Sequence, residues 1–197
     1  MNKFLTSIES HFANNYQLKQ IRPLESSVSS SVSIIIRKLS DYEILFIKRT
    51  KRESDKFSGH MAFPGGVKEV FDKDILSTAI RETSEEVGLD IKKNCNFIGR
   101  FSDYKPVNPN ANQFIVSPFI FFLNEPKITL KKNVDEVEDF VWIPIQVLLE
   151  LSTKSSRVTK KYNKTYKDNV FEYKGYTIWG MTGKILSSFL KEIETYF

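Results

Sequence analysis

Cysteine, histidine and long apolar runs are all scarce in this sequence. Its one cysteine, Cys95, excludes an internal disulfide framework and favours a reducing compartment. Residues 1–12 alternate polar and apolar side chains at helical spacing and contain no continuous apolar stretch. This pattern argues against a signal peptide or a membrane span in that segment, so we expect a cytoplasmic protein.

The net charge is also small for a chain of this length. The 197 residues include 29 Lys and Arg against 24 Asp and Glu, for a net charge of +5. That balance is compatible with an anionic substrate and does not indicate nucleic acid by itself. The hydrophobic content of 41% supports one globular domain over residues 1–197 with a substantial core.

Apolar runs rich in β-branched and aromatic residues alternate with helical patterns, which predicts an α/β fold. Strands are predicted at 32–37, 43–49, 61–63, 97–101, 113–123, 137–143, 170–173 and 176–179. Helices are predicted within the lead-in 1–29, from Pro144 to Leu151, and from about Thr182 to Tyr196. Pro118 predicts an edge or a bulge in its strand. The basic stretch Lys154–Lys167 is expected to be exposed, and the loop 105–112 to lie at a site mouth.

The rest of the chain is organised around the segment from Gly65 to Leu89. Asp72 or Asp74 can cap the start of a helix, and Gly88 can end it in the left-handed conformation. The predicted helix is about four turns long. Its apolar stripe contains Leu76, Ile80, Thr83 and Val87.

Three carboxylates, those of Glu82, Glu85 and Glu86, fall on the face opposite that stripe. Like charges at this spacing repel, and anions near a helix C-terminus oppose the helix dipole. Grouped carboxylate oxygens suit Mg²⁺ or Mn²⁺, hard cations that keep further positions for water and phosphate. The alternative interpretation is a solvated acidic face on which Arg81 pairs with Glu85.

The motif Arg-Glu-Thr-Ser-Glu-Glu-Val-Gly-Leu at 81–89 resembles the box of the Nudix hydrolase superfamily. Thr83 stands where that family usually has an aliphatic residue. The run from Gly66 to Arg81 is one residue longer than in the common box, and Lys73 stands where a glutamate is usual. Asp72 or Asp74 is the candidate for the structural role of that glutamate.

The insertion and the lead-in resemble the coenzyme A pyrophosphatase branch of that superfamily. The lead-in is Lys48-Arg49-Thr50, then Ser58-Gly59-His60-Met61-Ala62-Phe63-Pro64-Gly65-Gly66. Thr50, Lys56 and His60 depart from the signature of the branch. The resemblance covers about residues 30–195 and implies an α/β/α sandwich with a mixed β-sheet.

The resemblance implies a set of site residues. Those for metal are Glu82, Glu85 and Glu86; those for catalysis are Glu85, Glu86, Arg81 and Glu136; those for substrate are Gly65, Gly66, Arg49 and His60. Glu85 is either a ligand or the base that takes a proton from water, and Arg81 is expected to hold the loop or the carboxylates. Glu136 has a solvated turn as its alternative, and His60 a structural hydrogen-bonding role. Tyr104, Phe114, Phe119 and Trp179 could stack on an adenine, although a place in the core is the favoured interpretation for each.

The implied activity is metal-dependent hydrolysis of a nucleoside diphosphate linked to another moiety. Coenzyme A or acyl-coenzyme A, giving 3′,5′-ADP and phosphopantetheine, is the first expectation. ADP-ribose, NADH, dinucleoside polyphosphates and nucleoside triphosphates are the alternatives, and a non-catalytic nucleotide- or RNA-binding module is the third. We expect a small-molecule partner rather than nucleic acid or a membrane, and leave a homodimer open.

Overall fold

The computed structural model describes residues 3–14, 19–51, 59–106, 111–152, 156–161 and 164–197. For residues 14, 156–161 and 164–168 it describes the backbone and not the side-chain environment. Parts of three predicted segments therefore lie outside the described residues: most of the charged loop 51–56, positions 107–110 of the loop 105–112, and the side chains of Lys154–Lys167.

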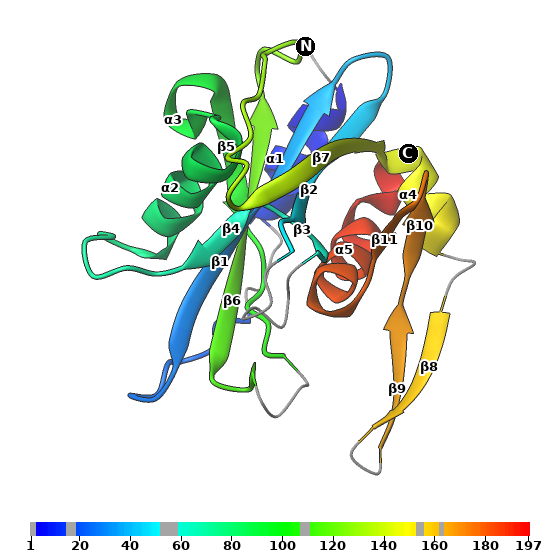
Figure 1. Ribbon diagram of the computed structural model, residues 1–197. Coiled ribbons are helices and arrows are strands. Elements are labelled where there is room, and N and C mark those ends of the chain that lie inside the picture. The colour runs from blue at the N-terminus through cyan, green and yellow to red at the C-terminus, as the bar shows by residue number, and fades with distance from the viewer. Residues whose placement is uncertain (1–2, 15–18, 52–58, 107–110, 153–155, 162–163) are drawn as a thin grey trace.

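A mixed β-sheet forms the centre of the molecule (Figure 1). Its strands are β1 Val28–Lys38, β2 Tyr42–Arg49, β3 Met61–Ala62, β4 Gly65–Val67, β5 Cys95–Arg100, β6 Phe114–Leu123 and β7 Val137–Pro144. The order is β3-β2-β1-β6-β5, while β4 pairs with β1 and β7 pairs with β2. β1 and β6 run parallel, and the hairpin of β1 and β2 is antiparallel as predicted.

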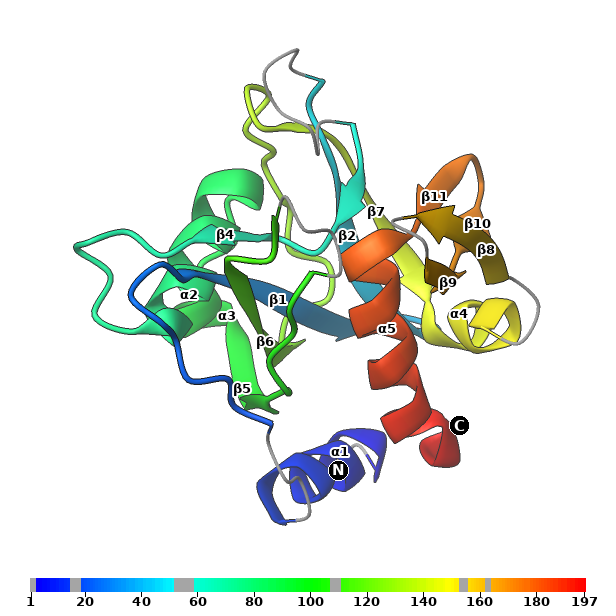
Figure 2. The same ribbon diagram turned by 90° about the horizontal axis from the view of Figure 1, so that it is seen from below.

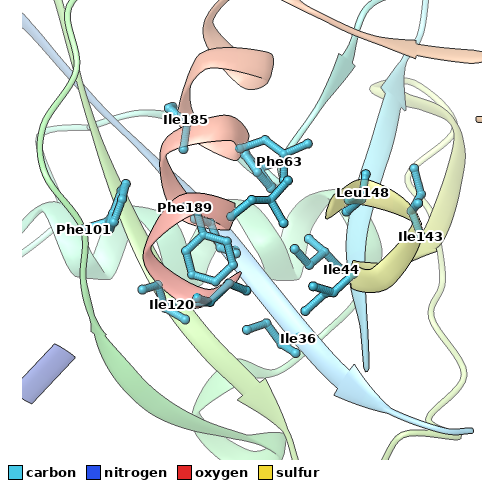
Figure 3. Packing of buried hydrophobic residues seen from close by; sticks show 14 of the residues in the cluster. Ile36, Ile44, Phe63, Phe101, Ile120, Ile143, Leu148, Ile185 and Phe189 are labelled. Atoms are coloured by element: carbon cyan, nitrogen blue, oxygen red, sulfur yellow. The ribbon is translucent and has the colours of Figure 1, made fainter. Parts of the chain in front are cut away.

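Helices cover both faces of this sheet, which confirms the predicted α/β/α sandwich (Figure 2). α2 Ile75–Val87 and α3 Ile91–Asn94 cover one face; α1 Lys3–Asn14, α4 Ile145–Ser152 and α5 Gly180–Ile193 cover the other. Successive strand residues point to opposite faces, so Ile35 packs under α2 while Ile34 and Ile36 face α1 and α5. Figure 3 shows the core on the second side, which includes Phe63, Phe101 and Phe189.

The prediction that Pro118 marks an edge or bulge is wrong. β6 lies between β1 and β5, and the register shift in its pairing with β5 falls between Phe97 and Gly99. The backbone carbonyl of Pro118 faces β5 just beyond the last paired residue, where it accepts a bond of 2.8 Å from Phe101 N. Since the N and C=O of a strand residue point the same way, the missing N–H costs no bond to β1.

Several short elements were not predicted. They are β4, α3 and the hairpin of β8 Ser156–Lys161 and β9 Lys164–Asn169 within the basic stretch. The hairpin of β10 Phe171–Tyr173 and β11 Tyr176–Ile178 was predicted, as was the C-terminal helix, which ends in a 3₁₀ turn, η2 Glu194–Tyr196.

Candidate active site

Helix α2 begins and ends where local signals predict. Asp74 is its N-cap and accepts a hydrogen bond of 2.7 Å from the backbone N of Ser77. Gly88 ends it with φ 67°, and its N–H bonds to the carbonyl of Ser84 at 3.0 Å. The helix packs against β1, and β4 passes beside its carboxylates. These caps fix where α2 begins and ends, and so fix the positions of the three glutamates relative to the loop before the helix.

Asp72 does not cap the helix; it is the buried partner of Arg81. Arg81 Nε donates to Asp72 Oδ1 at 3.0 Å and Nη2 donates to Oδ2 at 2.9 Å. Thr78 Oγ1 and the backbone N of Glu69 donate to the same carboxylate. These bonds, above all those from the Arg81 guanidinium, hold the pKa of Asp72 well below its usual range. Of the two aspartates considered for a structural role, Asp72 thus binds Arg81, whereas Asp74 caps the helix.

The guanidinium of Arg81 also holds two of the helix glutamates. Its Nη1 donates to Glu82 Oε1 at 2.9 Å and to Glu85 Oε2 at 2.8 Å, while Nη2 reaches the carbonyl of Val67 at 3.1 Å. The pair of Arg81 and Glu85 exists, as the alternative interpretation required, but it is one part of a larger network. Arg81 holds both the loop and the carboxylates, as expected.

Glu86 is buried, with 3% of its surface exposed. The prediction that it shares a face with Glu82 and Glu85, opposite the apolar stripe, is therefore wrong. The short strand β4, which the sequence did not reveal, covers it. The backbone N of Gly65 donates to Glu86 Oε2 at 2.9 Å. Burial raises the pKa of Glu86 to about 8, helped by the negative charges of Glu82 and Glu136 and opposed by the Gly65 bond and Arg49.

Gly66 provides room for the carboxylate of Glu82. A Cβ at Gly66 would lie 2.4 Å from the Glu82 carboxyl carbon, so a larger residue would displace that group. At Gly65, where φ is 153°, a Cβ would instead lie 2.1 Å from the backbone oxygen of Ser31. Burial raises the pKa of Glu82 as well, with smaller contributions from Glu85 and Glu136.

The loop that carries Glu136 is tied to both α2 and β2. Asn133 N donates to the carbonyl of Glu86 at 2.9 Å, and Thr50 N donates to that of Glu136 at 2.9 Å. The hydroxyl of Thr50 bonds to the carbonyl of Val134 at 3.1 Å. The charge of Glu136 acts on both Glu82 and Glu86, so four carboxylates form one electrostatically coupled group.

Thr83 departs from the aliphatic pattern because it has a polar partner inside the sandwich. Its hydroxyl donates to Ser33 Oγ at 2.8 Å and lies 2.8 Å from the carbonyl of Ala79. Thr83 and Ser33 are both fully buried. Ser33 was not singled out from the sequence; the available signal was a hydroxyl residue between the apolar Val32 and Ile34 of β1.

Arg49 and His60 are neighbours at the end of the β2–β3 ladder. Arg49 N donates to the carbonyl of His60 at 3.0 Å, and the positive charge of Arg49 lowers the pKa of Glu86. The ring of His60 lies 4.8 Å from that of Trp179. Among the aromatic candidates, Phe119 is buried in the core, Tyr104 and Phe114 are partly buried, and Trp179 is exposed.

Within the described residues, no three His, Cys, Asp or Glu side chains are arranged as a preformed metal site. One oxygen each of Glu82 and Glu85 accepts a hydrogen bond from Arg81, and one oxygen of Glu86 accepts a hydrogen bond from Gly65. The donor set nevertheless fits a hard divalent cation, because it consists of carboxylate oxygens whose mutual repulsion such an ion relieves. No helix in the described part of the chain is long and apolar enough to cross a membrane.

This mixed sheet between helical layers, with the glutamates of α2 beside the two glycines of β4, is the arrangement of a known domain family. The NUDIX domain model matches residues 29–163. The chain therefore belongs to the Nudix family, a family of pyrophosphohydrolases that generally use divalent metal ions.

Individual relatives are more distant. An uncharacterized protein of Schizosaccharomyces pombe is 40% identical over 129 residues, covering 60% of this chain and 38% of that protein. The peroxisomal coenzyme A diphosphatase NUDT7 of Mus musculus is 28% identical over 166 residues, covering 80% of this chain and 67% of the mouse protein. The structure of a C. elegans Ap4A hydrolase binary complex superposes with TM-score 0.55 at 17% identity, over 86% of this chain and 96% of that one. The superposition supports the fold.

Proposed function

We propose that this protein hydrolyses the diphosphate bond that links a nucleoside to a second moiety, with coenzyme A or acyl-coenzyme A as the preferred substrate. The main support is the buried carboxylate of Glu86, which accepts a hydrogen bond from Gly65 N and is repelled by the charges of Glu82 and Glu136. Such a shifted, clustered carboxylate is typical of functional sites. The coenzyme A preference rests on the lead-in to Gly66, the extra residue before Arg81, and the likeness to the mouse coenzyme A diphosphatase.

Glu82, Glu85 and Glu86 would hold Mg²⁺ or Mn²⁺. A cation bound there supplies charge neutralisation for the diphosphate and a lowered pKa for a bound water. Arg81 contributes by positioning, because its bonds to Asp72 and Val67 hold the loop while its Nη1 orients Glu82 and Glu85.

The remaining roles follow from position. Glu85, the more exposed carboxylate, or Glu136 takes the proton of the attacking water. The water oxygen joins one phosphorus, the bridging P–O bond breaks, and the other phosphate leaves with the bridging oxygen. Gly65 and Gly66 allow close approach of the backbone, Arg49 attracts the diphosphate, and His60 contacts the substrate beside it.

A substrate screen tests the proposal. Coenzyme A, ADP-ribose, NADH, diadenosine polyphosphates and nucleoside triphosphates are each assayed with Mg²⁺ and with a chelator, for the wild type and for Glu86→Gln. We expect coenzyme A to be cleaved with the highest kcat/KM, only with metal, and not by the variant. Faster cleavage of ADP-ribose would move the preferred substrate to the alternative, and near-normal activity of Glu86→Gln at saturating Mg²⁺ would contradict the assigned site.

The 3′-phosphate gives a sharper test of the coenzyme A preference. An enzyme for coenzyme A should bind that group with a lysine or arginine, and Lys154–Lys167 is the basic stretch available for it. Loss of one such charge-assisted bond costs about 1.5–3 kcal/mol, so dephospho-coenzyme A should have the lower kcat/KM. Equal values for the two compounds would show that the 3′-phosphate is not recognised. The cytoplasmic location stays a prediction, and a homodimer stays open.

A further inference from the structure

Trp179 is a large apolar side chain left open to solvent beside the candidate active site. It has 42% of its surface exposed, and its ring centroid lies 4.8 Å from that of His60 with the planes tilted by 60°. It stands between β11 and α5, and β11 contacts β3. An indole in this position is available for contact with a ligand.

The fold holds this indole outside the core. Ile178, the residue before it, is fully buried, so the alternation of the strand turns Trp179 outward. Gly180 follows with φ 63°, a conformation that lets the chain turn sharply into α5. Tyr176 Oη donates to Asp139 Oδ2 at 2.5 Å, which fastens the hairpin of β10 and β11 to β7. The exposure of Trp179 therefore follows from the backbone conformation at the junction of β11 and α5, which these contacts stabilise.

The ring pair of Trp179 and His60 is connected to the carboxylate group through Arg49. The carbonyl of His60 accepts a bond of 3.0 Å from Arg49 N. The guanidinium of Arg49 is close enough to Glu86 for its charge to act on that carboxylate. The aromatic pair is thus followed by a cation, Arg49, at the end of the β2–β3 ladder, and then by the buried carboxylate of Glu86 on α2.

We propose that Trp179 and His60 form the platform on which the nucleobase of the substrate stacks. The inference rests on the proposed function, since it assigns the base of a nucleoside diphosphate whose phosphates lie at Arg49 and the glutamates. Base stacking on an aromatic side chain needs an accessible ring face, which Trp179 provides. Phe119 is buried, and Phe71, although exposed, lies over the guanidinium of Arg81 at 5.5 Å.

The kinetic test compares three variants. Stacked bases contribute enough that Trp179→Ala should lower kcat/KM for the best substrate roughly 10-fold or more, mainly through KM. Trp179→Phe keeps a ring and should retain most of the activity. Phe97→Ala is the matched control, because Phe97 is 53% exposed but lies on β5, at the far end of the strand order. Equal kcat/KM for Trp179→Ala and Phe97→Ala would overturn the proposal.

A binding test does not depend on turnover. ADP and phosphopantetheine are titrated separately into the metal-free wild type and into Trp179→Phe while tryptophan emission is recorded. ADP should quench the emission of the wild type, and the quenching should be lost in the variant, whose remaining Trp142 is covered by Arg37 at 4.1 Å. Unchanged emission with ADP, or quenching by phosphopantetheine instead, would overturn the platform. If none of the diphosphate compounds is hydrolysed, the proposed function is rejected. The fluorescence titration with ADP would still decide whether Trp179 binds a nucleobase.

Discussion

Thr83 and Ser33 share a buried hydrogen bond of 2.8 Å between their hydroxyl groups, which joins α2 to the central strand β1. The pair stands between the helix that carries the glutamates and the sheet beneath it. An aliphatic residue at position 83 would pack in the same place but would leave the Ser33 hydroxyl with only the longer contact of 3.3 Å to the carbonyl of Ala79. The two positions therefore act as one unit.

Thr83→Val should lower the free energy of unfolding by about 1–2 kcal/mol, because a buried hydroxyl loses a partner. Ser33→Ala with Thr83→Val should recover most of that loss, since both polar groups are then absent. Urea unfolding of the two single variants and the double variant measures the coupling. Additive effects would show that the hydroxyls do not depend on each other.

Asp72→Asn should destabilise the protein by roughly 1–3 kcal/mol at neutral pH through weakened bonds to Arg81. The wild-type pKa of Asp72 is lowered by folding, so its contribution is present above the unfolded pKa of about 3.9 and is lost as pH falls toward the folded value. The melting temperature of the wild type should thus fall more steeply below about pH 4 than that of Asp72→Asn. Parallel curves between pH 2 and 6 would contradict this assignment, and Asp41→Asn, at an exposed turn, is the control.

Gly66→Ala should separate activity from stability. The added methyl would meet the flexible end of Glu82, so the fold should keep its melting temperature within a few degrees while kcat falls by an order of magnitude or more. Gly65→Ala would meet the backbone of β1 instead and should lower the melting temperature clearly. Calorimetry and a turnover assay on both variants give the comparison; an active Gly66→Ala enzyme would argue that Glu82 is dispensable.

Glu86→Gln should abolish turnover and yet stabilise the metal-free protein at alkaline pH. Folding raises the pKa of Glu86 from about 4.3 to about 8, so the wild type is most stable below the lower value and loses stability as pH rises through the upper one. The variant has no such loss, and its melting temperature in chelator should exceed that of the wild type by several degrees at pH 8.5 but not at pH 4.

Millimolar Mg²⁺ or Mn²⁺ supplies the complementary measurement. An ion that binds the native state raises stability by mass action, so the wild type should gain melting temperature and Glu86→Gln should gain less. An identical response of both proteins would remove Glu86 from the set of ligands.

The sequence predicted what depends on local chemistry. Asp74 and Gly88 delimit α2 because a short carboxylate accepts the first N–H groups of a helix and glycine adopts the left-handed conformation. The two faces of β1 follow from its run of isoleucines. The pair of Arg81 and Glu85 follows from helical spacing, because the two residues stand four positions apart.

The features that it did not predict depend on distant segments. β4 consists of two glycines and a valine, and becomes a strand because β1 pairs with it. The burial of Glu86 follows from that strand, so the prediction that Glu86 lies with Glu82 and Glu85 on the face opposite the apolar stripe is wrong. In the same way, the sequence could not choose Trp179 from the other aromatic candidates, because its exposure is set by the meeting of β11 with α5.

Arg81 uses all five of its N–H donors: two bonds to Asp72, one each to Glu82 and Glu85, and one to the carbonyl of Val67. The guanidinium of Arg81 thus serves as an internal counter-ion for Asp72, Glu82 and Glu85. A divalent ion bound by Glu82 and Glu85 would share these carboxylates with the guanidinium, because Arg81 bonds to only one oxygen of each. The positive charge of Arg81 therefore reduces the repulsion between these glutamates in the metal-free protein.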